Sequence, residues 1–290
     1  MDVIRGKREL QLRADAERAA GRRIALVPTM GALHAGHLSL VHSAQARADR
    51  TWVSIFVNPT QFNQNSDFDG YPRDLEGDLD TCRDNGVDLV YTPEVEDLYP
   101  EGEQTRVEVV RLSQPLCGER RLGHFRGVST VVAKLLLAAK PHLAIFGEKD
   151  FQQLAIIRRM VRDLGIDVEI LGGAIVREPD GLALSSRNVH LGPVARGQAV
   201  ALVQAMDAAH RAVAKGERSR DALLARVRDR LGEASLAAID YAELRDPDTL
   251  ELAPETLCGP VLLALALNFE RDPDGAGAPV RLIDNRILLR

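Results

Sequence analysis

The sequence predicts an α/β protein with a Rossmann-like parallel-sheet domain and a second, smaller α+β domain at the C-terminal end. Between residues 1 and 91, short apolar runs alternate with helical patterns, which is typical of βαβ units. After residue 177 the order changes to helices followed by strands, without that alternation. We therefore expect one domain over residues 1–176 and another over residues 177–290.

Composition excludes several classes of protein. The chain has 290 residues, of which 45% are hydrophobic and 27% charged, an ordinary mixture for a soluble globular protein. A net charge of −5 argues against a nucleic-acid binder that relies on bulk electrostatics. No stretch approaches about 18 uncharged apolar residues, so no membrane span is expected. The three cysteines are far apart and suggest reduced thiols, and hence a cytoplasmic protein.

The first domain opens with a charged, Ala-rich helix over residues 5–20, which Gly21 ends. An apolar strand follows over 24–27, and it should stop at Pro28 because proline cannot continue a central strand. After Gly36 the pattern becomes helical, with Leu38, Val41 and Ala44 on one face. The remaining elements up to residue 91 are a strand at 53–57, a helix at 74–85 and a strand at 87–91.

The rest of the chain is assigned in the same way. In the first domain we predict a short strand at 107–110, a cationic loop at 123–127, a helix at 128–139, a strand at 143–146, a helix up to 164 and a strand at 168–171. In the second domain we predict helices at 195–215 and 219–231 and strands at 238–245, 261–267 and 280–283. The segment 272–279 is rich in Gly, Pro and Asp, so we expect an exposed hairpin loop far from the functional motifs.

Two histidines stand where the helix after Gly36 begins. His34 and His37 are three residues apart and therefore lie on one side of the helix start. A helix N-terminus binds anions, and two imidazoles there suit the charge that builds on a phosphate under attack. The pattern also occurs with no function at wet helix ends. Zinc fits less well, because it takes three or four ligands and no Glu follows His34 in the metalloprotease arrangement.

Four polar clusters lie in loops that follow predicted strands or precede predicted helices. In a parallel sheet such loops face one crevice. Their side chains donate hydrogen bonds as a phosphate site requires, while the glutamines suit a substrate that carries hydroxyls or a carboxylate. Neither a nucleophile elbow nor a Walker loop is present, which favours phosphoryl or nucleotidyl transfer by positioning. The clusters are Met30–His37; Asn58 with Gln61; Lys149, Asp150, Gln152 and Gln153; and Ser185, Ser186 and Arg187.

Each cluster also has a purely structural explanation. Ser185 and Ser186 could cap a turn, and Lys149 with Asp150 could be a surface pair. Gln152 and Gln153 point about 100° apart on a helix, so at most one should reach a given ligand. Four nearby carboxylates could hold Mg²⁺ or could belong to an ordinary acidic loop. These carboxylates are Asp67, Asp69, Asp74 and Asp78.

Several motifs in order resemble those of the pantoate–β-alanine ligase (pantothenate synthetase) family. The first motif also resembles the wider His-x-Gly-His nucleotidyltransferase-like superfamily. The motifs are PTMGALHAGH (28–37), FVNPTQF (56–62), YPR (71–73), GHFRGVST (123–130), FGEKDFQQL (146–154), DGLALSSRN (180–188) and RLIDN (281–285).

This resemblance implies a cytoplasmic homodimer that joins pantoate to β-alanine in two half-reactions. ATP and pantoate would give pantoyl adenylate and pyrophosphate, and β-alanine would then displace AMP. Gln61 and Gln153 would hold pantoate, and Mg²⁺ would accompany ATP with Asp78 as its first candidate ligand. The resemblance implies His37 as general acid, with His34, Lys149 and Arg187 as the other catalytic positions. The implied ATP contacts are Met30, Gly31, Ala32, Leu33, His34, Ala35, Gly36, His37, Gly147, Glu148, Lys149, Asp150, Val176, Leu184, Ser185, Ser186 and Arg187.

Two other functions remain open from the residues alone. A cytidylyl- or adenylyltransferase acting on a phosphorylated substrate would need more basic residues for its second anion, and the neutral Gln61 and Gln153 weigh against it. A nucleotide-sensing module without turnover would not need His34, His37 and Lys149 together, and production of AMP would exclude it.

Overall fold

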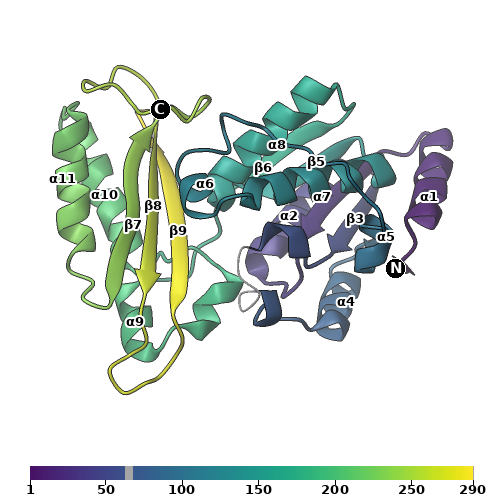
Figure 1. Cartoon of the computed structure of the whole chain (residues 1–290), viewed down its shortest axis with the longest axis horizontal. Helices are drawn as coiled ribbons and strands as arrows, with labels where there is room; N and C mark the ends of the chain where they lie inside the picture. Colours follow the sequence, from purple (N-terminus) through teal and green to yellow (C-terminus); the bar gives the residue numbers. More distant parts are fainter. Residues whose placement is uncertain (63–67, 290) are drawn as a thin grey trace. The chain divides into compact units, whose positions relative to one another are not determined.

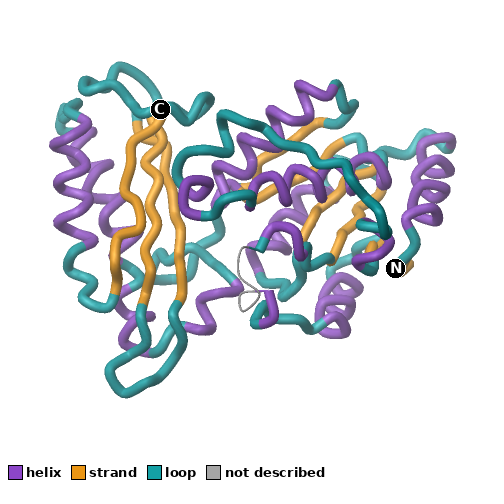
Figure 2. Tube along the Cα trace, viewed as in Figure 1, coloured by secondary structure: helices purple, strands orange, loops and turns teal. Residues whose placement is uncertain are grey.

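The computed structural model describes residues 1–62 and 68–289. The chain divides into two compact units, Met1–Ala174 and Ile175–Arg290. Figure 1 traces the chain from one unit to the other, and Figure 2 shows where helices and strands lie along it. The division falls two residues before the boundary that the sequence suggests at 176/177.

The first unit is built on a parallel sheet of six described strands in the order β1-β4-β3-β2-β5-β6. Along the chain, strands are added on one side of β2 as far as β4, and then on its other side with β5 and β6. The strand order therefore reverses between β2 and β5, the position where open α/β sheets bind their ligands. The strands are β1 (Asp2–Ile4), β2 (Ile24–Thr29), β3 (Arg50–Ile55), β4 (Leu89–Tyr91), β5 (Leu143–Gly147) and β6 (Glu169–Gly173).

Helices cover this sheet because its strands are apolar on both faces. On one face, Leu40, Val41 and Ala44 of α2 and Leu79 and Cys82 of α4 form a buried cluster with alternate strand residues. Leu38, expected on that face, is only half-buried. Helices α1 and α8 each contact α7, and all three contact strands of the sheet (Figure 1). The helices and 3-10 turns are α1 (Lys7–Ala19), α2 (Ala35–Gln45), η1 (Pro59–Gln61), α4 (Leu75–Asp84), α5 (Val95–Leu98), α6 (Cys117–Arg120), α7 (His124–Ala139), η2 (Glu148–Asp150) and α8 (Phe151–Leu164).

Three predicted details of this unit are wrong. Pro28 does not end β2, because beyond Leu26 this strand pairs only with β3, so one side of its backbone needs no donor. Residues 107–110 form no strand; instead the Val107 N–H donates to the Thr130 hydroxyl (3.0 Å). Residues 124–127 are not a loop, because α7 already begins at His124, after Gly123 in a left-handed conformation (φ 81°).

The second unit packs helices against a three-stranded antiparallel sheet in the order β7-β8-β9. Leu263, Leu265 and Leu267 of β8 are fully buried in a core shared with α10 and α11. The predicted helix 195–215 is interrupted at residues 199–200 and forms α9 and α10. The elements are η3 (Ser186–His190), α9 (Pro193–Gln198), α10 (Ala201–Ala214), α11 (Arg220–Leu231), β7 (Ala237–Arg245), β8 (Val261–Phe269) and β9 (Val280–Leu288).

The connection between β8 and β9 is the expected hairpin loop, with residues 273–275, 277 and 279 exposed, but it does not lie far from the motifs. Asp272 within it is buried, and its carboxylate accepts hydrogen bonds from the N–H groups of Val194 (2.7 Å) and Ala195 (2.9 Å) at the start of α9. Ala278 N–H donates to the carbonyl oxygen of His190 (2.8 Å), the last residue of η3. The loop is therefore packed against the segment that follows the DGLALSSRN motif, and is not remote from it. Among residues 1–62 and 68–289, no helix is long and apolar enough to cross a membrane.

Candidate active site

The loop after β2 is shaped by one buried carboxylate. Gly31 (φ 84°) and Ala32 (φ 50°) are both left-handed, so the chain turns sharply behind Thr29. Asp78, in the first turn of α4, accepts hydrogen bonds from Ala32 N–H (2.9 Å) and Leu33 N–H (2.7 Å). A Cβ at residue 31 would lie 2.7 Å from Asp78 Oδ2, so only glycine leaves room for this contact. Burial raises the pKa of Asp78, against the lowering effect of the two N–H donors.

The two histidines cap the helix that this loop begins. Gly36 N–H donates to His34 Nδ1 (3.1 Å), and His34 N–H donates to His37 Nδ1 (3.4 Å), which is a reciprocal capping box. A backbone N–H can only donate, so each δ nitrogen must be an unprotonated acceptor. Each neutral ring therefore carries its proton on Nε2. In each ring, Nδ1 caps the helix and Nε2–H is left as a hydrogen-bond donor.

Both imidazoles are neutral near pH 7. Desolvation lowers the pKa of His37 to about 3, and His34 and Lys149 act in the same direction. Burial is the largest cause that lowers the pKa of His34, and the positive charge of Lys149 is the next. The two ring centroids are 4.1 Å apart. The sequence motif is thus a pair of N–H donors held beside a lysine.

Lys149 reaches the histidines from the other side of the point where the strand order reverses. It lies in η2, directly after β5, while the histidines follow β2. The positive charge of Lys149 lowers the pKa of both imidazoles, so Lys149 lies near them. The loops after β2 and β5 are therefore neighbours, as expected from the sheet topology. Glu148 and Asp150 lie beside it in the same turn.

The two glutamines at the start of α8 have different surroundings, as their spacing predicts. Gln152 is buried, accepts from Cys117 N–H (3.1 Å) and donates to the carbonyl oxygens of Leu112 (2.9 Å) and Pro115 (2.7 Å). It fastens the 112–117 segment to α8. The Gln153 side chain is half-buried and forms no hydrogen bond within the described chain, so it is the one available to a ligand.

Gln61 lies at the end of η1 and joins the loop after β3 to the loop after β2. Its Nε2 lies 3.0 Å from Met30 Sδ, and its Oε1 accepts from Asn58 Nδ2 (3.0 Å). The side chain is almost fully buried. The expected neighbourhood of these two loops is confirmed, since their side chains touch. The contact with Asn58 is also compatible with a purely structural role for Gln61, so its role in pantoate binding stays a prediction.

The predicted site residues of the second unit form one continuous segment. Leu184 N–H donates to the carbonyl oxygen of Val176 (2.9 Å), which closes a turn between them. Ser185 caps η3 by accepting from Arg187 N–H (3.2 Å), so the capping role considered for the serines is present for Ser185. Ser186 and Arg187 are half-buried within η3.

A partly buried ion pair anchors this turn. The Arg177 guanidinium donates to both carboxylate oxygens of Asp284 in β9 (2.7 and 3.0 Å) and to the Gly181 carbonyl oxygen (3.0 Å). Asp284 is buried and also accepts from Asn285 N–H (2.8 Å). The RLIDN motif thus has a structural role that the sequence alone did not reveal. Its Asp284 holds Arg177, which lies 107 residues earlier, and so supports the segment from Val176 to Arg187.

The acidic residues do not assemble into a metal cluster. Within the part of the chain that the structure describes, no group of three or more His, Cys, Asp or Glu side chains is arranged to hold a metal ion. Asp74 caps α4 by accepting from Gly77 N–H (3.1 Å), and Asp67 lies outside the described residues. Asp78 has one hydrogen bond on each carboxylate oxygen, so its service as an Mg²⁺ ligand stays a prediction.

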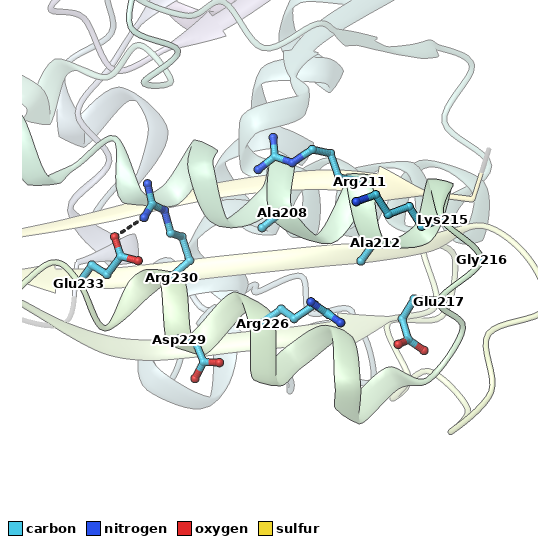
Figure 3. Close-up of a pocket in the computed structure, with 10 residues that line it drawn as sticks. All are labelled: Ala208, Arg211, Ala212, Lys215, Gly216, Glu217, Arg226, Asp229, Arg230 and Glu233. Atoms are coloured by element: carbon cyan, nitrogen blue, oxygen red, sulfur yellow. Dashed lines mark hydrogen bonds and ion pairs between the residues drawn. The ribbon is translucent and has the colours of Figure 1, made fainter.

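The second unit also has an open groove between α10 and α11, shown in Figure 3. Its rim carries charges of both signs, and Arg230 of α11 forms an ion pair with Glu233, three residues further along the chain (Figure 3). None of its lining residues is among the predicted site residues. The groove is lined by four basic and three acidic side chains and shares no residue with the chemistry considered above. These side chains are Arg211, Lys215, Arg226, Arg230, Glu217, Asp229 and Glu233.

The family model for pantoate-beta-alanine ligase matches residues 2–287. The chain belongs to this family. The pantothenate synthetases of Syntrophobacter fumaroxidans and Geobacter sulfurreducens are each 50% identical to this member, over 288 and 292 residues, and the matches cover 99% of each chain. The crystal structure of pantothenate synthetase from Thermus thermophilus matches with a TM-score of 0.90 at 41% identity over 100% of both chains.

A second solved member of the pantoate–β-alanine ligase family carries ligands. The enzyme from Francisella tularensis, complexed with β-γ ATP and β-alanine, matches with a TM-score of 0.75 and 31% identity, over 99% of this chain and 97% of that one. The predicted α/β fold, with its six-stranded parallel sheet and small antiparallel sheet, is confirmed by these relatives.

Proposed function

We propose that this chain is a pantoate–β-alanine ligase that works through a pantoyl-adenylate intermediate. Membership of the family over nearly the whole chain carries the proposal. In the first half-reaction a pantoate carboxylate oxygen attacks the α-phosphorus of ATP, and the bond to the β-phosphate oxygen breaks to release pyrophosphate. In the second, the β-alanine amine attacks the acyl carbon, the carbon–oxygen bond to AMP breaks, and the nitrogen loses a proton.

The geometry of the first unit suits the adenylation step. His34 and His37 each offer an Nε2–H donor at a helix N-terminus, and Lys149 adds a positive charge beside them. Charge grows on the phosphate oxygens as the α-phosphorus is attacked, so preorganised donors lower the barrier more than they strengthen ground-state binding. His37 as the general acid would use the same Nε2 proton. In the second unit, Val176, Leu184, Ser185, Ser186 and Arg187 are proposed to contact ATP.

Gln61 and Gln153 are proposed to hold pantoate. The Gln61 amide is hydrogen-bonded to the Met30 side chain, and Gln153 lies in the first turn of α8, four residues after Lys149 in η2. Amide groups bind a carboxylate or hydroxyl without adding a charge that would hold the acid too tightly for reaction. Phe56, Val57 and Phe62 flank the Gln61 loop and provide apolar surface for the two methyl groups of pantoate.

Mg²⁺ is proposed to enter with ATP. The ion is usually held through substrate phosphates with one or two carboxylates, and this matches a site that offers Asp78 and no acidic cluster in the described chain. When bound, it would neutralise charge on the phosphates. We further propose a cytoplasmic homodimer that has no nucleic-acid or membrane partner.

Exchange of isotope between pyrophosphate and ATP tests the two-step reaction. We expect exchange with pantoate present and β-alanine absent, because the adenylate forms before the amine is needed. Adding β-alanine should then release AMP and pantothenate. Exchange that requires β-alanine would eliminate a separate adenylate, and exchange with a phosphorylated acceptor in place of pantoate would favour a nucleotidyltransferase.

A further inference from the structure

We infer that Tyr99 is a positioning residue for pantoate recognition, acting through Asn58 on the Gln61 amide. The inference rests on the proposed role of Gln61 in binding pantoate. Tyr99 follows α5 and is 38 residues beyond Gln61 in sequence, and no motif of the chain includes it. Its hydroxyl nevertheless reaches Asn58, the residue that holds the Gln61 side chain.

The orientation of the Asn58 amide is fixed by groups of known polarity. Thr60 N–H, which can only donate, points at Asn58 Oδ1 (3.4 Å), and the Gly127 carbonyl, which can only accept, faces Nδ2 (3.2 Å). Tyr99 Oη donates to the same Oδ1 at 2.8 Å, the shortest of its hydrogen bonds. Asn58 is 1% exposed, so water does not replace these partners.

The consequence for Gln61 is that it presents donors and no acceptor. Asn58 Nδ2 donates to Gln61 Oε1, which turns Gln61 Nε2 toward Met30 Sδ. A thioether is a weak acceptor, so the amide hydrogens are available to a stronger one. The main chain is held as well, because His124 Nδ1 lies 2.7 Å from the Gln61 carbonyl oxygen. A carboxylate is the group of pantoate that such an amide selects.

Tyr99 is itself held rigidly enough to transmit this orientation. Its ring lies 6.4 Å from that of Phe56, and the Lys134 ammonium lies 4.5 Å from the centre of its ring. Lys134 in turn donates to the Leu98 carbonyl oxygen and to Glu103, each at 2.6 Å. Burial raises the pKa of Tyr99, so its hydroxyl remains a donor at physiological pH.

The test is Tyr99→Phe, which removes the hydroxyl and keeps the packed ring. The hydroxyl also lies 3.2 Å from Thr60 Oγ1, but only its bond to Asn58 bears on Gln61 directly. We expect loss of that bond to raise the KM for pantoate roughly fivefold, with kcat and the KM for ATP nearly unchanged. Tyr91→Phe is the matched control, since that buried hydroxyl donates to Asp97 (2.7 Å) and not to the Gln61 network. It should leave both KM values unaltered.

A double-mutant cycle with Gln61→Ala shows whether Tyr99 acts through Gln61. We expect Tyr99→Phe to have no further effect on the pantoate KM once Gln61 is alanine. If the two effects multiply, or if Tyr99→Phe alone leaves the pantoate KM unchanged, the inference is overturned. Failure of Gln61→Ala to alter that KM would instead overturn the proposed role of Gln61, so the two failures are distinguishable.

Discussion

In His34 and His37, Nδ1 accepts a capping hydrogen bond and Nε2 carries the proton. Removing the His37 side chain should therefore affect both the helix cap and the reaction rate. His37→Ala loses the Nε2–H donor and half of the capping box, and Lys149→Ala loses the adjacent charge. We expect kcat to fall roughly a hundredfold or more, since one such donor typically contributes about 3 kcal/mol to the barrier. The free energy of unfolding should change by only about 1 kcal/mol.

Steady-state rates at saturating substrates, together with urea unfolding, measure both quantities. Lys215→Ala, on the second unit, serves as the control for loss of a lysine. A near-normal kcat in either site variant would remove that residue from the mechanism.

A second prediction at the level of single residues concerns the Gln61 amide. Gln61→Ala should raise the KM for pantoate tenfold or more, because an unpaired partner costs about 1–3 kcal/mol. Gln61→Glu should be worse, since it offers only acceptors and a negative charge to a carboxylate. The KM for ATP should change much less in both variants.

Gln152→Ala is the matched control, because that glutamine is buried and bonded to the 112–117 segment. It should lower the melting temperature without raising the pantoate KM. Equal shifts of both KM values in Gln61→Ala would favour a purely structural Gln61.

Some of these residue roles follow from the sequence, and others depend on the folded structure. The meeting of His34, His37 and Lys149 was predictable, because strand-end loops of a parallel sheet converge. The capping box was not, since it depends on how each ring is turned. Asp78 was considered only as a metal ligand, although its carboxylate supports the loop from Ala32 to Leu33. Tyr99 carried no signal at all, because its contact with Asn58 exists only in the folded chain.

Among the elements, the contact of α7 with η1 requires the absence of a side chain. A Cβ on Gly127 would lie 2.4 Å from the Thr60 carbonyl oxygen and 2.8 Å from Gln61 Cα. Gly127→Ala should therefore destabilise the protein by about 1–3 kcal/mol, as overpacking does, and should raise the pantoate KM by displacing Gln61. Thermal melting and substrate titration measure the two effects.

Gly197→Ala in α9 is the control, since a Cβ there meets nothing within 4 Å. It should preserve or slightly increase stability, because alanine favours helix. If Gly127→Ala kept wild-type stability and KM, η1 would have to be more adaptable than its packing indicates.

The elements also show why some boundaries were missed. The alternation of strands and helices was strong enough to predict the parallel sheet. The sequence predicts a loop at 123–127 because two glycines and two cationic residue types cluster there. Helix α7 nevertheless begins at His124, and Gly127 within it contacts η1. Residues 107–110 have the pattern of a strand, but no strand forms there, and the Val107 N–H donates to the Thr130 hydroxyl instead.

For the stability of the molecule, one buried carboxylate gives a pH-dependent prediction. Glu17 in α1 is surrounded by Arg13, Arg22 and Arg50, and the hydrogen bond from Arg22 is the main cause that lowers its pKa to about 2. A carboxyl with a depressed folded-state pKa stabilises the protein fully above its unfolded value of about 4.3. That contribution is lost as the pH falls from there to about 2.

Glu17→Gln should therefore be less stable than the parent by about 2 kcal/mol near pH 7, allowing for solvent screening of the arginines, and the difference should vanish toward pH 2. The single tryptophan, Trp52 in β3, reports unfolding of this unit by its fluorescence. The depressed histidine pKa values act in both proteins and cancel in the difference. A gap that stayed constant with pH would mean that packing, and not charge, is what Glu17 contributes.

The Arg177–Asp284 pair has a consequence for the time course of synthesis. A ribosome adds roughly 5–20 residues per second, so the 107 residues between the two partners take roughly 5–20 seconds to make. During that interval the first unit is complete, and the turn from Val176 to Leu184 exists without the carboxylate that holds it. We expect the segment from Val176 to Arg187, which is proposed to contact ATP, to acquire its shape only after β9 has been synthesised. The folding of this segment therefore waits for Asp284.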